Sequence, residues 1–306
     1  MNIISYYLPH FLKNTIYFLN PNKNNNYLLK KPKIDDIKNL KLIILNIDGV
    51  LCVDNKPITI AKETFNYFRK NNNDIKICVL TNECRKTPKI IKKELITLGY
   101  NMTNIKVISA SSIILEYIRS IISNSNSNKI LNISLVVEET PYFYIKDNIT
   151  NEYNNVQFHW IFDKKMNHNN QHIDYFIIGR INNNITNNNN KLKEILLNSI
   201  KNNKDAKFII TSDNNIKNTN TRTTINTLLP IDIIRFINNE LNLYIKSHCP
   251  FKTDFNIIKN QSKSLYNNDV SIENKEILII DDNFDNIDNI DINKELNINK
   301  GLVLTG

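Results

Sequence analysis

The sequence predicts an α/β protein built on a parallel sheet, and two observations lead to this prediction. Short apolar runs occur at residues 42–45, 75–80 (where Lys76 is the one polar residue) and 277–280, and such runs are typical of strands buried on both faces of a parallel sheet. Stretches with helical periodicity follow the first two runs. Strands that alternate with helices need crossover connections, which make neighbouring strands parallel.

The other elements follow in order along the chain. Residues 60–70 place Ala61, Phe65 and Phe68 on one helical face, and a second helix over 88–98 stops at Gly99, a common helix end. The middle of the chain is less regular. It predicts strands over 133–137, 175–178 and 208–210 and helices over 191–201 and 231–241. Residues 301–304 are expected to form the last strand.

The composition restricts the classes of protein to which this chain can belong. The 306 residues are enough for two modest domains. Asparagine makes up about a fifth of them, which we attribute to A/T-rich codons, so tracts such as 187–190 are expected to be loop filler. The net charge is +9, but residues 1–34 contain five lysines and no acid, so the remainder is only mildly basic. Nucleic acid is therefore not favoured, although a nucleic-acid or ribonucleoprotein partner stays open.

The N-terminus and the cysteines indicate the cellular compartment in which the protein is expected. Residues 1–37 are predicted to be a basic N-terminal extension or targeting segment. The four cysteines have no CxxC spacing, which indicates a reducing compartment rather than a secreted disulfide scaffold. No apolar stretch approaches the ~18–20 residues of a membrane span. We expect a cytoplasmic or organellar protein that is not secreted and has no membrane span.

Polar residues follow three of the predicted strands, and in an open α/β sheet ligands bind at those carboxyl ends. The sequence there resembles the haloacid dehalogenase superfamily of phosphatases. Residues 45–51, Leu-Asn-Ile-Asp-Gly-Val-Leu, resemble its first motif, Asp-x-Asp-Gly-Thr/Val-Leu. Leu80-Thr81-Asn82 resembles the second motif and Ile279-Ile280-Asp281-Asp282 the fourth, while His248-Cys249-Pro250 falls where the third has Gly-Lys-Pro. The ordered set is similar to subfamily IIA, whose members are 4-nitrophenyl phosphate, phosphoglycolate and pyridoxal phosphate phosphatases.

This resemblance implies a Rossmann-like parallel-sheet core with an inserted α/β cap domain of the C2 type. The core is expected over residues 38–109 plus 244–306, and the cap over 110–243. In this subfamily the cap selects the substrate, and a homodimer formed through the cap is a further expectation. His159, His168 and His172 are expected on the surface of an Asn-rich cap loop.

The resemblance also assigns roles at the first two motifs. The first Asp of the family attacks phosphorus, and Asn46 stands at that position. A carboxamide is a very poor nucleophile and a weaker Mg²⁺ ligand than a carboxylate. Asp48 keeps the position of the general acid/base. Thr81 is expected to be catalytic and, with Asn82, to bind the phosphate, although both are also ordinary turn residues.

The third and fourth motifs are also altered. Cys249 occupies the position of the lysine that neutralises phosphate, and Lys246 or Lys252 could replace it only if the loop is rebuilt. Asp282 is retained as a metal ligand, and Asn46 with the backbone of Asp48 completes the predicted set. Mg²⁺ is thus the expected cofactor if any is bound.

Two further alternatives concern these motifs. Asp285 and Asp288 are neighbouring acids that could substitute for missing metal ligands. Cys52, Cys84 and Cys249 with His248 could form a thiolate or zinc cluster, but they lack the usual ligand spacing, and isolated thiols in packed loops are commoner.

Three functional hypotheses follow. The first is a catalytically impaired pseudophosphatase with a binding or assembly role, whose partner is a phosphorylated small molecule or a protein. The second is an active Mg²⁺-dependent phosphomonoesterase of the 4-nitrophenyl phosphatase or phosphoglycolate phosphatase type. The third is a truncated gene product, because the family continues past Thr-Gly by a strand and a helix, which would leave one sheet edge uncovered. The first is favoured because losing the nucleophile alone nearly abolishes turnover.

Overall fold

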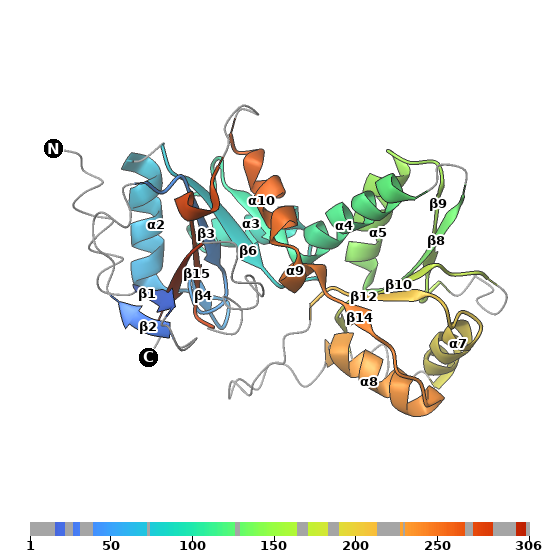
Figure 1. The fold of residues 1–306 in the computed structure, drawn as a ribbon. Helices are drawn as coiled ribbons and strands as arrows, with labels where there is room; N and C mark the ends of the chain where they lie inside the picture. Colours follow the sequence, from blue (N-terminus) through green and yellow to red (C-terminus); the bar gives the residue numbers. More distant parts are fainter. Residues whose placement is uncertain are drawn as a thin grey trace. The chain divides into compact units, whose positions relative to one another are not determined.

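The structure is a computed structural model that describes residues 16–21, 27–30, 39–71, 74–125, 129–163, 171–182, 190–212, 227–228, 230–266, 272–283 and 298–303. The chain divides into two compact units, each with its own sheet (Figure 1). Unit 1 comprises residues 1–81, 88–108 and 252–306, and unit 2 comprises residues 82–87 and 109–251.

The described strands of unit 1 form a sheet in the order β2-β1-β16-β15-β3-β6-β7. The neighbours β16, β15, β3 and β6 are parallel, which confirms the predicted parallel sheet. The bounds are β1 Ile16–Pro21, β2 Tyr27–Lys30, β3 Leu42–Asn46, β6 Lys76–Thr81, β7 Lys106–Ser109, β15 Ile277–Asp281 and β16 Asn299–Val303.

Helices cover both faces of this sheet because alternate strand residues point to opposite sides. Helices α2 (Thr59–Asn71) and α3 (Pro88–Thr97) share one apolar cluster with Ile43, Leu45 and Ile77. The neighbouring strand residue Cys78 lies on the other face, where its thiol donates to the hydroxyl of Ser262 in α10 (Phe255–Lys263) at 3.4 Å. The short elements of unit 1 are β4 (Cys52–Val53), β5 (Lys56–Pro57) and the 3-10 helix η3 (Asn274–Glu276), while α9 (Pro250–Thr253) crosses the boundary between the units.

The N-terminal stretch contributes two strands to the sheet of unit 1. Strand β1 pairs antiparallel with β16, with Ile16 opposite Val303, and β2 pairs antiparallel with β1. The sheet edge beyond β16 is therefore occupied by β1, which the sequence analysis did not anticipate. Whether residues 1–37 also target the protein to an organelle stays a prediction.

Unit 2 contains a parallel sheet in the order β14-β12-β10-β8-β9. Helices α4 and α5 share an apolar cluster with one face of this sheet, and α7 and α8 share another cluster with its other face. The bounds are α4 Ala110–Asn124, β8 Leu131–Val136, α5 Glu139–Thr150, β9 Val156–Trp160, β10 Tyr175–Ile178, β11 Ile181–Asn182, α7 Asn190–Lys201, β12 Lys207–Ile210, β13 Thr227–Leu228, α8 Pro230–Leu241 and β14 Ser247–His248.

One residue of unit 2 corrects an expectation. His159, predicted on a surface loop, is buried within β9, where its Nε2 lies 3.1 Å from Asn132 Oδ1 on β8. His172 is exposed as predicted, and His168 lies outside the described residues. None of the helices that the structure describes is long and apolar enough to cross a bilayer.

Candidate functional site

Three neighbouring strands of unit 1 end at the same edge of its sheet. In the parallel register, Asn46 at the end of β3 lies opposite Leu80, and Leu45 lies opposite Ile280. The next residues along β6 and β15 are Thr81 and Asp281. The structure thus brings the first, second and fourth predicted motifs to one edge, where open α/β sheets bind their ligands.

The chain turns sharply after β3. Gly49 has a φ of +74°, a left-handed conformation that glycine adopts without steric cost. Its N–H donates to the Cys52 carbonyl at 2.8 Å, and the Cys52 N–H donates to the Ile47 carbonyl at 2.9 Å. This turn leaves the Asp48 side chain exposed.

The side chain of Asn46 is held at both ends by the same loop. Its Oδ1 accepts from the Ile47 N–H at 2.8 Å, and its Nδ2 donates to the Asp48 carbonyl at 3.3 Å. Because a backbone N–H can only donate, its partner must be the amide oxygen, which fixes the orientation of the carboxamide. The amide therefore braces the turn at the position where the family has its nucleophile.

The carboxylate of Asp282 lies directly against Gly49. A Cβ atom added at Gly49 would stand 2.0 Å from Asp282 Oδ2 and 2.1 Å from its Cγ. The buried Asp281 accepts from the Asn283 N–H at 2.9 Å and so holds the turn after β15. Asp282 is thus brought to the loop that carries Asn46 and Asp48, while Asp285 and Asp288 lie outside the described residues.

The predicted Mg²⁺ ligands do not form a ready metal site. Mg²⁺ prefers an octahedron of oxygen ligands, often carboxylates. Of the three predicted ligands only Asp282 offers a carboxylate, because Asn46 and the Asp48 backbone offer neutral amide oxygens, each of which also accepts a hydrogen bond within the loop. Within the described ranges, no three His, Cys, Asp or Glu side chains are grouped to hold a metal ion. These residues therefore do not fit a resident Mg²⁺ ion, and no chemical step is assigned to one.

The other predicted site residues occupy different positions. Thr81 is 2% exposed at the end of β6, beside the strand that carries Asn46. Asn82 is half-buried and belongs to unit 2. Cys249 also belongs to unit 2, where it is buried in an apolar cluster with Phe208 and Ile237. Cys249, at the position where the family has its lysine, therefore contributes to packing. Lys246, nearby in the sequence, is exposed.

The cysteines do not support the thiolate or zinc alternative. All four are buried, and none forms a disulfide. Burial, with a smaller contribution from the charge of Asp48, raises the pKa of the Cys52 thiol to about 11. Burial also raises the pKa of Cys78 to about 11. Such thiols stay protonated at neutral pH, whereas a metal ligand or nucleophile must be a thiolate.

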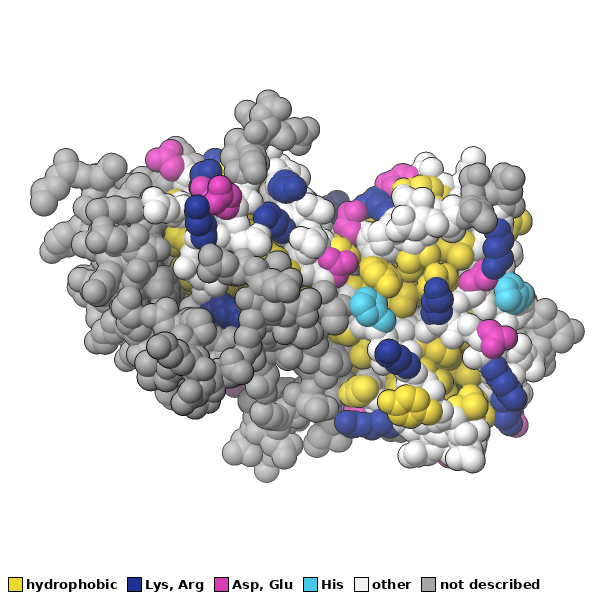
Figure 2. Space-filling view, viewed as in Figure 1, with side chains coloured by type: hydrophobic (Ala, Val, Ile, Leu, Met, Phe, Trp, Pro, Cys, Tyr) yellow, Lys and Arg dark blue, Asp and Glu magenta, His cyan; other side chains and the backbone are white. Residues whose placement is uncertain are grey.

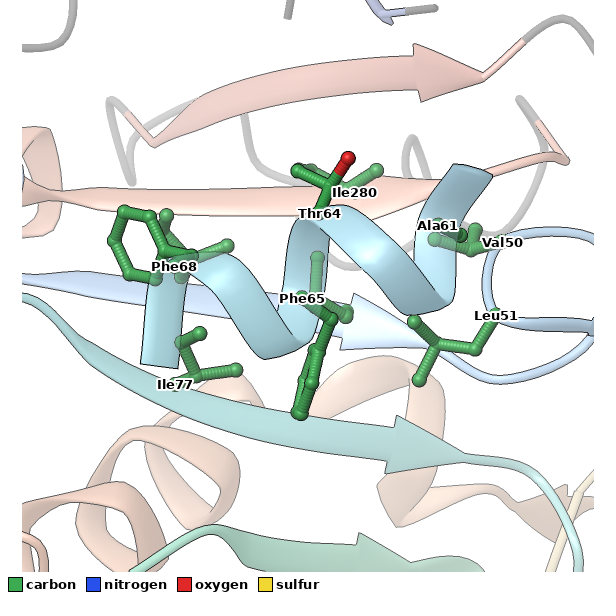
Figure 3. A pocket seen from close by; sticks show the side chains of 10 residues that line it. Val50, Leu51, Ala61, Thr64, Phe65, Phe68, Ile77 and Ile280 are labelled. Atoms are coloured by element: carbon green, nitrogen blue, oxygen red, sulfur yellow. The ribbon is translucent and has the colours of Figure 1, made fainter. Parts of the chain in front are cut away.

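A small cavity in unit 1 is apolar. It has a volume of about 40 Å³ and lies between α2 and the sheet, as Figure 3 shows. Thr64 is the one polar residue in its lining, which otherwise consists of Ile43, Leu45, Val50, Leu51, Ala61, Phe65, Phe68, Ile77 and Ile280. A cavity this small and apolar is a packing gap and not a phosphate site.

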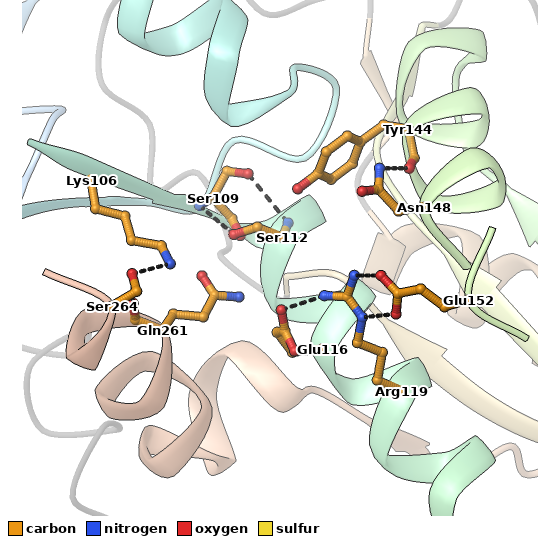
Figure 4. Close-up of polar contacts among 10 residues, drawn as sticks. All are labelled: Lys106, Ser109, Ser112, Glu116, Arg119, Tyr144, Asn148, Glu152, Gln261 and Ser264. Carbon is orange, nitrogen blue, oxygen red and sulfur yellow. Dashed lines mark hydrogen bonds and ion pairs between the residues drawn. The ribbon is translucent and has the colours of Figure 1, made fainter. Parts of the chain in front are cut away.

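Unit 2 also contains charged pairs that were not predicted from the sequence. Arg85 donates to both carboxylate oxygens of Glu83, from Nε at 3.1 Å and from Nη2 at 2.8 Å. Burial raises the pKa of Glu83, but the hydrogen bonds and charge of Arg85, with the charge of Arg180, outweigh burial and lower it overall. Figure 4 shows a second group, in which Arg119 joins Glu116 at 2.6 Å and Glu152 at 2.5 Å. Glu116 and Arg119 lie three residues apart on α4, a helix that was not predicted, whereas the pairs Glu83–Arg85 and Arg119–Glu152 follow no helical spacing.

Comparisons with known proteins agree with this architecture. Residues 43–158 match the sequence model of the haloacid dehalogenase-like hydrolases. No curated protein matches the chain. Solved structures that resemble it include a putative nagD protein, 14% identical, with a TM-score of 0.59 over 84% of this chain and 86% of that one.

Two 4-nitrophenyl phosphatases also resemble the chain. The p-nitrophenyl phosphatase from Archaeoglobus fulgidus is 14% identical, with a TM-score of 0.56 over 80% of both chains. The 4-nitrophenylphosphatase from Thermotoga maritima is 12% identical, with a TM-score of 0.58 over 84% of both chains. At these identities the likeness establishes the fold, a Rossmann-like core with a cap, as the sequence predicted.

Proposed function

We propose, on the premise that residues 43–158 are a haloacid dehalogenase-like hydrolase region in a capped phosphatase fold, that this chain is a catalytically impaired phosphatase retained for binding. The observation that carries the proposal is the carboxamide at position 46, hydrogen-bonded at both its oxygen and its nitrogen. It stands where the resemblance assigns the nucleophile.

Attack on phosphorus needs an electron-rich, anionic oxygen. The amide oxygen of Asn46 is neutral and already accepts a hydrogen bond from Ile47, which further lowers its nucleophilicity. In an enzyme whose catalytic groups act as a unit, removing the nucleophile alone costs on the order of 10⁴–10⁶ in kcat. The remaining groups of the site cannot restore such a loss.

The alternative is an active Mg²⁺-dependent phosphomonoesterase of the 4-nitrophenyl phosphatase or phosphoglycolate phosphatase type. A specific observation favours it, because Asp48 and Asp282 are retained and both lie at the turn around Gly49. A general acid alone leaves the phosphoryl group without an acceptor on the protein, so this alternative needs another residue, or water, to attack phosphorus.

The experiment is Mg²⁺-dependent hydrolysis of 4-nitrophenyl phosphate by the purified chain. The variants are Asn46→Asp, Asp48→Asn and, as a control for added charge, Asn154→Asp at an exposed position of unit 2. We expect no turnover by the wild type and by Asn154→Asp, and turnover by Asn46→Asp. Clear wild-type turnover that disappears in Asp48→Asn would mean that another group attacks phosphorus and would overturn the proposal.

The binding role is a proposal about the partner. We expect a phosphorylated small molecule or a protein, and a homodimer through unit 2 is a further candidate. On the face shown in Figure 2, lysine and arginine side chains lie interspersed with acidic ones, which supports a protein surface better than a nucleic acid as the partner. Buried cysteines that form no disulfide support a reducing cytoplasmic or organellar compartment.

A further inference from the structure

The turn that follows β3 is joined to α3 by a tyrosine side chain. The hydroxyl of Tyr100, which lies shortly after the end of α3, donates to the Leu51 carbonyl at 2.5 Å. The Tyr100 N–H donates to the Leu95 carbonyl at 3.0 Å and ties this residue to the helix. The same Leu51 carbonyl accepts from the Ile58 N–H at 2.8 Å, just before α2 begins. One carbonyl of the turn is therefore held by residues next to two helices.

Tyr100 can fix this carbonyl because its own side chain is fixed. The residue is 2% exposed, and its ring packs nearly perpendicular to that of Phe65 on α2, with 5.4 Å between the ring centroids. Burial raises the pKa of Tyr100, so its hydroxyl stays a protonated donor at neutral pH. A hydrogen bond in a buried environment is stronger than one in water, and losing it leaves the partner unsatisfied.

The packing beneath the turn leaves room for movement. Val50 and Leu51 line the apolar cavity of about 40 Å³ between α2 and the sheet, as Figure 3 shows. Side chains that border an empty cavity lack contacts on that side, so packing there restrains them less. The hydrogen bonds of the Leu51 carbonyl therefore contribute more of the restraint on the turn.

Hydrogen bonds connect Leu51 to the candidate site. Its N–H donates to the Ile47 carbonyl at 2.9 Å, and the Ile47 N–H donates to Asn46 Oδ1 at 2.8 Å. We infer that Tyr100 is a positioning residue, whose hydroxyl fixes Leu51 and, through Ile47, holds the carboxamide of Asn46 in place. The inference concerns the geometry of the turn, so it does not rest on the phosphatase proposal.

Tyr266 provides a matched control at the opposite end of β3. Its hydroxyl donates to the Lys41 carbonyl, directly before the strand begins. Burial raises the pKa of Tyr266, as it does that of Tyr100. Tyr100→Phe and Tyr266→Phe therefore each remove one hydroxyl that donates to a backbone carbonyl of unit 1. Only the first of these carbonyls belongs to the turn that holds Asn46.

The test is hydrogen exchange of the Leu51 and Ile47 backbone amides, followed by nuclear magnetic resonance of the full ¹⁵N-labelled chain. We expect Tyr100→Phe to raise both exchange rates at least about fivefold, which corresponds to the ~1 kcal/mol of one hydrogen bond. Tyr266→Phe should leave both rates close to those of the wild type, because these amides exchange by local opening of the turn. Equal rates in the two variants, whether raised or unchanged, would overturn the inference.

A second arm measures turnover of 4-nitrophenyl phosphate in the Asn46→Asp background. There Tyr100→Phe should lower kcat by about tenfold or more, because the group at position 46 is displaced, and Tyr266→Phe should not. An active Asn46→Asp chain whose kcat is unaffected by Tyr100→Phe would also overturn the inference. This arm alone rests on the proposed function. An Asn46→Asp chain without turnover would count against that function, and the exchange rates would still decide the role of Tyr100.

Discussion

The carboxylate of Asp282 fills the space that a side chain at Gly49 would occupy, with Oδ2 only 2.0 Å from the position of an added Cβ. The two residues come from different motifs of the sequence, one after β3 and one after β15. Because glycine has no side chain, the fourth motif can lie against the loop of the first. This contact is what makes the edge of unit 1 a single site.

The first prediction concerns Gly49→Ala. The substitution places a methyl group on Asp282 and strains a backbone at φ +74°, so we expect it to lower the free energy of unfolding by roughly 2–4 kcal/mol. Urea denaturation measures this loss. Gly99→Ala is the control, because φ is +91° there but the nearest atom is the flexible Lys62 side chain at 3.3 Å. Equal losses in both variants would show that displacement of Asp282 contributes nothing.

The second prediction concerns Thr211→Val. The buried Thr211 hydroxyl has the Cys84 thiol, a weak hydrogen-bonding group, as its partner, so replacing the hydroxyl with a methyl group of similar shape should raise the free energy of unfolding by ~1 kcal/mol. Thermal unfolding measures the change. Thr150→Val is the comparison, since that hydroxyl donates to the Lys146 carbonyl at 2.9 Å, and its removal should not stabilise. A destabilised Thr211→Val would mean that the hydroxyl already has a stabilising role.

The third prediction concerns pH. The pKa of Glu83 is lower in the folded chain than its usual value of 4.5, so the unfolded state binds more protons in the range below that value. The contribution of Glu83 is therefore fully present above about pH 5 and is lost as the pH falls through the folded pKa. We expect the free energies of unfolding of the wild type and of Glu83→Gln to differ at pH 7 and to converge at about pH 3.5. A difference that stays constant over this range would contradict the assignment.

Much of the fold could be predicted from the sequence because its central strands are almost entirely apolar runs. The predicted strands at 42–45, 75–80 and 277–280 correspond to β3, β6 and β15, and the helices at 60–70 and 88–98 to α2 and α3. Helices α4 and α5 were missed, although α4 has a capping box at Ser109 and Ser112, because its start overlaps the end of β7. The β1–β16 pairing was missed since it joins opposite ends of the chain, which local patterns do not record.

Part of the candidate site could be predicted because the motifs follow one another in a fixed order along the chain. Motif order indicated that Asn46, Thr81 and Asp282 would meet at one edge, and the strand register places them there. The hydrogen bonds of the Asn46 amide depend on the local path of the turn, which sequence does not specify. Likewise, nothing in the sequence indicated that Cys249 would pack in the apolar core of unit 2.

The central claim, that Asn46 cannot accept a phosphoryl group, is tested most directly by mass spectrometry of the intact protein. Wild type and Asn46→Asp are mixed with 4-nitrophenyl phosphate and Mg²⁺ and quenched in acid, which preserves acyl phosphates. We expect unmodified wild type, and in Asn46→Asp a mass increase of one phosphoryl group that peptide mapping places on residue 46. A phosphorylated wild-type chain would contradict the account, and the modified residue would identify the true nucleophile.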